Sequence, residues 1–105
     1  MSKKEIREKS RALYETIVKL QDVDECCRFF EDLCTPNELR AMEQRFDVAK
    51  MLHDGKVYTT ILNETGASSA TVSRVNRVLN YGTGALAEIM DRVSNGKSEA
   101  AQEEA

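Results

Sequence analysis

The sequence predicts an all-α protein built from about six helices. Apolar residues recur at every third or fourth position along most of the 105 residues, which is the spacing of amphipathic helices. The single proline and the five glycines fall between these stretches, where they begin or end helices. Residues 57–62 are rich in strand formers, but no neighbouring stretch offers a partner strand, so we expect a short helix there too. A chain of this length forms one small domain.

The first two predicted helices carry apolar residues that need covering. Residues 3–20 form the first helix, and either Asp22 or Asp24 begins the second. The second helix is apolar over a wide arc around Phe29 and Phe30, and a short helix of this kind is usually buried on two sides. We expect another subunit to supply the second wall; a helix at the centre of a monomeric bundle is the alternative.

The third helix has the clearest start signal in the sequence. Thr35 is the N-cap, Pro36 occupies the first helical position and Glu38 is the capping-box partner. Gly55 ends this helix. A short helix over residues 57–64 must then precede the next glycine turn.

Residues 65–79 show the pattern of the second half of a helix-turn-helix motif. Gly66 supplies a tight turn, and Ser68 or Ser69 caps the next helix. Apolar residues then repeat on one side of that helix, at Val72, Val75 and Leu79. An ordinary helical hairpin is the structural alternative.

The remaining surface of this helix is small, polar or cationic, which suits the DNA major groove. No acid occurs from Thr65 to Ala87, so this face is locally positive although the chain has a net charge of −3. We therefore predict binding to double-stranded DNA, with the preceding helix crossing the backbone. The predicted DNA-binding residues are Thr59, Thr60, Ser68, Ser69, Ala70, Thr71, Ser73, Arg74 and Arg77. Because the net charge is acidic, a module that docks a protein on the same motif is the alternative function.

The end of the chain predicts one more helix and a tail. Gly82 ends the preceding helix, and Thr83 caps a last one that is apolar at Leu86, Ile89, Met90 and Val93. Residues 95–105 lack an apolar stripe and predict a disordered tail after a domain over residues 1–94.

The composition argues against several classes of protein. No apolar run reaches the roughly 18 residues of a membrane span, and the N-terminus is charged, so we expect a cytoplasmic protein that does not bind membranes. Cys26, Cys27 and Cys34 make a poor disulfide framework and are interpreted as reduced core residues. Because His53 is the only histidine, we expect no metal, no cofactor and no nucleophile–base pair for catalysis.

Arg45 lies near the buried face of the third helix, next to Phe46. Its neighbours Glu43 and Asp47 are not at the spacing that pairs charges on a helix. A surface or interface salt bridge is the favoured interpretation, and a cation that faces a pocket for an anionic ligand is the other.

Several of these features together resemble the tryptophan-repressor superfamily, and in particular its small bacterial Trp-repressor-like proteins. They are Thr35-Pro-Asn-Glu, Arg45, the Gly55 stop, Gly66-Ala67 and Ala70-Thr-Val-Ser-Arg74, and the resemblance covers residues 33–93. The resemblance implies an intertwined homodimer whose two recognition helices meet successive major grooves of a palindromic operator. It also implies that Thr35, Arg45 and Arg74 occupy ligand-pocket positions.

Two positions of that implied pocket differ from the tryptophan-binding members. Val75 stands where those proteins have a glycine, and Val78 stands where they have a serine that helps bind the amino group. Added methyl groups would fill the cavity, and the lost hydroxyl would leave a buried ammonium without a partner. We therefore expect a repressor that does not respond to tryptophan, with another effector or none. An amino-acid-sensing repressor that uses Arg45 and Arg74 is a further alternative.

Overall fold

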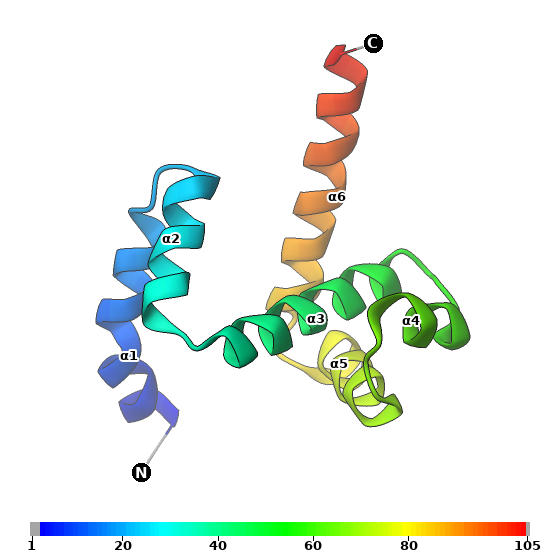
Figure 1. Cartoon of the computed structure of the whole chain (residues 1–105), viewed down its shortest axis with the longest axis horizontal. Coiled ribbons are helices and arrows are strands. Elements are labelled where there is room, and N and C mark those ends of the chain that lie inside the picture. The colour runs from blue at the N-terminus through cyan, green and yellow to red at the C-terminus, as the bar shows by residue number, and fades with distance from the viewer. Residues whose placement is uncertain (1–2, 105) are drawn as a thin grey trace. The chain divides into compact units, whose positions relative to one another are not determined.

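The computed structural model describes the backbone of residues 3–104 and the side chains of residues 10–94. In this part of the chain it contains only α-helices, which confirms the predicted fold class (Figure 1). The helices are α1 (Lys3–Val18), α2 (Val23–Leu33), α3 (Pro36–His53), α4 (Tyr58–Thr65), α5 (Ser69–Tyr81) and α6 (Ala85–Glu104). The stretch rich in strand formers is α4, as the absence of a partner strand predicted.

The chain divides into two compact units, and the boundary falls within α3. Residues 1–39 form one unit, and residues 40–105 form the other. No described helix is long and apolar enough to cross a membrane.

The first unit contains α1, α2 and the start of α3. Asp22 begins α2, because its carboxylate accepts a hydrogen bond of 2.8 Å from the Glu25 N–H. The Glu25 carboxylate in turn accepts one of 3.2 Å from the Gln21 N–H, which completes the cap. The rings of Phe29 and Phe30 pack edge to face, with centroids 5.3 Å apart.

The three cysteines are free thiols, but they are not core residues of the single chain. Cys27 is exposed, Cys26 and Cys34 are only half-buried, and α2 contains no buried residue. The core prediction is therefore wrong for the chain taken by itself. The single chain leaves these apolar positions of α2 without full cover, and the sequence analysis expected another subunit to supply part of that cover.

The predicted cap of α3 is confirmed atom by atom. The Thr35 N–H donates to Glu38 Oε1 at 2.8 Å, and the Glu38 N–H donates to Thr35 Oγ1 at 3.2 Å. The backbone N–H of Thr35, and then its side chain, hold the pKa of the Glu38 carboxyl below its ordinary value of 4.5.

The C-terminal end of α3 is held by a glycine turn and by α6. Gly55 is left-handed at φ 83°, and Lys56 N–H closes the turn on Met51 O at 3.0 Å. His53 Nε2 lies 2.6 Å from Asp91 Oδ1 of α6. The last turn of α3 is thus joined to α6 by a side-chain bond.

The core of the second unit is assembled from α3, α4, α5 and α6. Its buried residues are small or aliphatic: Val48, Ala49, Ile61, Ala67, Val72, Val75 and Met90. Val72 and Val75 are therefore on the buried side of α5, as predicted, and Leu79 packs against the core from a half-buried position.

The last helix differs from the sequence prediction at both ends. Gly84, and not Thr83, is the N-cap position, because its carbonyl accepts the first helical bond from Glu88 N–H at 3.1 Å. Thr83 instead accepts from Ala85 N–H at 3.3 Å. The α6 backbone continues to Glu104, past the predicted start of the tail at Asn95, through a stretch rich in the strong helix formers Ala, Glu and Gln. The side chains of residues 95–105 lie outside the described part, and the disordered tail stays a prediction.

Candidate nucleic-acid interface

Helices α4 and α5 form the helix-turn-helix that the sequence predicted (Figure 1). Gly66 ends α4 in the left-handed region, at φ 72°, and its N–H donates to Leu62 O at 3.0 Å. Ser68 is the N-cap of α5, because its hydroxyl accepts from Thr71 N–H at 3.1 Å. Ser69 is the first helical residue, so of the two predicted N-caps Ser68 is correct and Ser69 is not.

The turn between the two helices is fastened by residues that sequence reasoning did not single out. Thr65 Oγ1 donates to Ile61 O at 2.7 Å and accepts from Ala67 N–H at 3.1 Å. Gln44 Nε2 of α3 donates to Thr65 O at 3.2 Å. A threonine at the last position of a helix is a local signal for such a bond, but nothing in the sequence points from Gln44 to the turn.

Every predicted DNA-binding residue is accessible in the second unit. Those that are exposed are Thr59, Ser68, Ser69, Ala70, Ser73, Arg74 and Arg77, and those that are half-buried are Thr60 and Thr71. A shallow hollow of about 260 Å³ on α5 is lined by Ala70, Ser73, Arg74, Arg77 and Val78. The structure thus brings four of the predicted residues together on one concave surface, and it adds Val78 to them.

Thr71 and Ser68 are engaged with each other at the start of α5. The Thr71 hydroxyl accepts a hydrogen bond from the Ser68 hydroxyl at 3.1 Å, and the Thr71 N–H is bound in the cap. Thr71 therefore supports the start of α5.

Arg74 and Arg77 carry the positive charge of this surface. Neither arginine forms an ion pair within residues 10–94, whereas Arg11 and Arg28 of the first unit pair with acids one turn away. The nearest acids in sequence, Glu64 and Glu88, flank the motif from outside. Both guanidinium groups are therefore free to meet phosphate or guanine.

A second, larger pocket lies between α3, α5 and α6. Its volume is about 540 Å³, and it is lined by Arg45, Phe46, Ala49, Ala70, Thr71, Arg74, Val75, Val78 and Leu86. Arg45 and Arg74 come together here, and Arg45 forms no ion pair among the described side chains, so the favoured salt bridge is not made within this part of the chain. Thr35 is not among the lining residues; its hydroxyl is bound to Glu38 N–H in the cap of α3.

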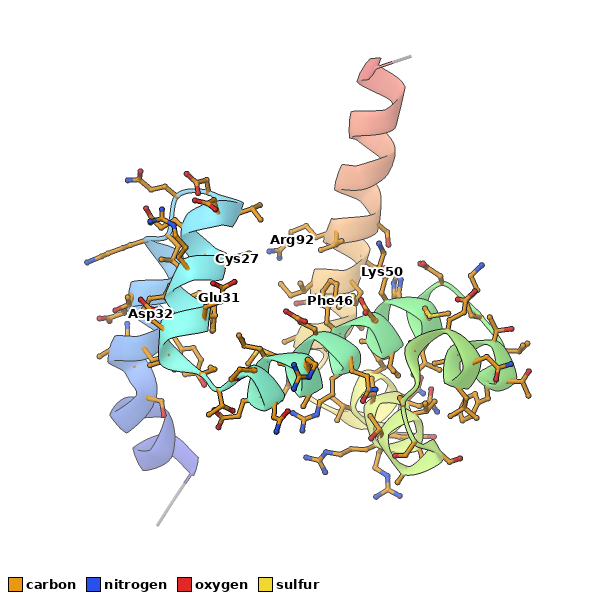
Figure 2. All side chains as sticks on the ribbon, viewed as in Figure 1. Cys27, Glu31, Asp32, Phe46, Lys50 and Arg92 are labelled. Atoms are coloured by element: carbon orange, nitrogen blue, oxygen red, sulfur yellow. The ribbon has the colours of Figure 1, made fainter. Side chains whose placement is uncertain are left out.

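The two valines that differ from the tryptophan-binding members both line this pocket. Val75 is 6% exposed and packs into the core, while Val78 is 41% exposed at the rim. Phe46 adds an aromatic ring and projects from the same side of α3 as Lys50 (Figure 2). The pocket surface is thus mainly apolar, with its two lining charges at Arg45 and Arg74.

Comparisons with known proteins agree with this fold. Residues 8–94 match the family of the Trp repressor protein. The protein YerC of Bacillus subtilis (strain 168) is 51% identical over 87 residues, which make up 83% of this chain and 84% of YerC. A crystal structure of a "putative Trp repressor" from Staphylococcus aureus is 43% identical, with a TM-score of 0.82 over 90% of this chain and 95% of that chain. A TrpR like protein from Eubacterium eligens ATCC 27750 is 46% identical, with a TM-score of 0.78 over 83% of this chain and 90% of that chain. The chain belongs to the Trp repressor family.

Proposed function

We propose that this protein is a sequence-specific DNA-binding regulator, a repressor that acts on the chromosome in the cytoplasm with α5 as its recognition helix. The observation that carries the proposal is the hollow on α5, where Ala70 and Ser73 lie beside two arginines that form no ion pair among the described side chains. Small side chains allow close approach to the groove floor, and arginine binds guanine or phosphate. Family membership supports a regulator rather than an enzyme.

Helix α4 would contribute contacts to the DNA backbone. Thr59 and Thr60 lie in its first turn, and Val57, its N-cap, provides no side-chain hydrogen bond. The first N–H groups of α4 therefore have no side-chain cap, and Lys56 adds a positive charge just before them. Phosphate contacts of this kind set the register of a protein on the duplex, while α5 reads the bases.

Selection from a random DNA library tests this proposal directly. The purified full chain should enrich a palindrome, because a twofold dimer presents the same helix to each half-site. A variant with Arg74→Ala and Arg77→Ala serves as the control, and it should enrich no motif. If the wild-type protein selects no sequence, the DNA proposal fails and the protein-docking module becomes the better interpretation.

We also propose that the protein acts as a dimer. In the single chain, apolar side chains of the second unit remain exposed: Met42 and Phe46 at 46%, Ile89 at 43% and Val93 at 37%. In the first unit, α2 buries none of its residues. Large apolar side chains left exposed in each unit are what an interface between two copies of the chain would cover. Light scattering should give twice the 11.8 kDa mass of the chain, and Ile89→Lys should shift the protein toward the monomer.

The pocket suggests that tryptophan is not the effector. Val75 and Val78 bring methyl groups to its wall, and a buried ammonium would find no hydroxyl at position 78. Calorimetry against the twenty amino acids tests this statement together with its alternative, amino-acid sensing through Arg45 and Arg74. We expect no heat of binding with tryptophan. Heat for tryptophan only after Val75→Gly and Val78→Ser would show that the two valines exclude it.

A further inference from the structure

We propose that Gln44 and Thr65 are positioning residues for DNA recognition. Together they fix the turn between α4 and α5, and so the angle at which α5 meets the bases. This inference rests on the proposed function. It concerns two residues that the DNA does not need to touch.

Thr65 joins the two sides of the turn through a single hydroxyl. Its Oγ1 donates to Ile61 O within α4 at 2.7 Å and accepts from Ala67 N–H beyond Gly66 at 3.1 Å. Ala67 is 6% exposed, so water cannot readily replace this partner. Without the hydroxyl, Ala67 would no longer be hydrogen-bonded to the C-terminal end of α4.

Gln44 ties the same turn to α3. Its Nε2 donates to Thr65 O at 3.2 Å, across 21 residues of sequence. Thr65 O is among the last carbonyls of α4, which have no donor within their own helix. One turn further along α3, Val48 is fully buried in the core. The bond therefore anchors the turn to a helix that is itself held by packing.

Hydrogen bonds matter at this turn because the residue that reverses the chain contributes no packing of its own. Gly66 has no side chain, and no atom beyond its two chain neighbours lies within 4 Å of the place that a Cβ would occupy. Its left-handed φ of 72° lets the chain reverse, but it does not by itself fix the direction of α5. The Ser68 cap belongs to α5 and moves with it.

A small rotation at the turn would be enough to disturb base recognition. At about 1.5 Å per residue, Arg77 lies roughly 13 Å along α5 from Ser68, so a rotation of about 5° moves it by roughly 1 Å. Functional side chains must be placed within about 0.5 Å. Attraction to phosphate is long-ranged and tolerates such a shift, whereas paired hydrogen bonds to a base do not. Loss of the turn bonds should therefore reduce specificity before it reduces non-specific affinity.

The test compares Gln44→Met and Thr65→Val with the wild-type full chain. Methionine keeps the length of Gln44 without its donor, and valine keeps the shape of Thr65 without its hydroxyl. Thr65→Ser is the matched control because it retains both hydrogen bonds. Each protein is titrated with the duplex enriched in the library selection and with a random duplex of equal length. Circular dichroism at the same temperature verifies that each variant is folded.

We expect the ratio of the affinity for the selected duplex to that for the random duplex to fall about tenfold in Gln44→Met, the factor that one hydrogen bond is worth. It should fall at least as far in Thr65→Val, which loses two hydrogen bonds. The affinity for the random duplex and its salt dependence should not change, and Thr65→Ser should behave as wild type. A purely structural role would leave the ratio unchanged in any folded variant, and that result would overturn the inference. If Thr65→Val does not fold, the Gln44→Met variant alone tests the inference. Gln44 is only half-buried, so its replacement should leave the protein folded. A wild-type chain that selects no sequence would instead refute the proposed function.

Discussion

Replacing Arg77 with alanine should remove one phosphate contact from each protomer on DNA. Arg77 is exposed, lies beside Arg74 in the hollow on α5, and has no ion pair within residues 10–94. Its full charge is therefore available to displace a counterion from the duplex. Each such contact contributes about 0.9 to the slope of log affinity against log salt concentration.

In the dimer that we propose, two contacts are lost, and the slope should flatten by about 1.8. A fourfold reduction in salt should then multiply the ratio of wild-type to variant affinity by about twelve. The loss should be similar for the selected duplex and for a random one, because phosphate contacts carry no sequence information.

The assay is fluorescence anisotropy of a labelled duplex over a series of salt concentrations. Arg92→Ala is the matched control, because it removes the same charge from α6, on a side chain that projects away from α5 (Figure 2). The control should keep the wild-type slope. Equal slopes for Arg77→Ala and wild type would refute the phosphate contact. An equally flattened slope in Arg77→Ala and Arg92→Ala would show that the salt dependence reflects the net charge of the protein and not a contact of Arg77.

Three further predictions concern the free energy of unfolding, each measured by urea denaturation followed by circular dichroism at 222 nm. Val72 is 0% exposed, so Val72→Ala should lower the free energy of unfolding by about 2 kcal/mol, because two methyl groups are lost and a cavity is left. The better helix propensity of alanine offsets a small part of this loss. Val57→Ala is the control: Val57 is 64% exposed, so this change should lower the free energy of unfolding by less than about 0.5 kcal/mol. Equal losses in the two variants would contradict a core position for Val72. Gly66→Ala should lower the free energy of unfolding by about 1–2 kcal/mol through backbone strain, since a Cβ there meets no atom within 4 Å beyond its two chain neighbours. The lowered pKa of Glu38 means that its carboxylate stabilises the fold fully above the ordinary value of 4.5 and that this contribution is lost as the pH falls through the folded value. The difference in unfolding free energy between wild type and Glu38→Gln, which keeps the cap but removes the charge, should therefore narrow below pH 4.5. A constant difference would show that the charge of the carboxylate does not stabilise the cap.

Helix boundaries could be predicted well because they depend on residues within one turn of each other. The Thr35–Glu38 cap and the Gly66 turn were located from sequence, and both are present. The buried side of α5, with Val72 and Val75, followed from the period of the helix. The choice of Gly84 over Thr83 as the last N-cap could not be made in this way, because either residue suits the position.

The tertiary structure decided everything that joins residues distant in sequence. It placed Arg45 with Arg74 and Val78 in one pocket, and it linked Gln44 to the carbonyl of Thr65. It also left α2 without a fully buried residue in the single chain, although its wide apolar arc predicted burial on two sides. Periodicity shows which face of a helix is apolar, but which other element meets that face depends on the path of the backbone. The sequence by itself therefore determined the helices and the surface that we propose binds DNA, and the packing of α3 against α5 and α6 determined the pocket and the anchor of the turn.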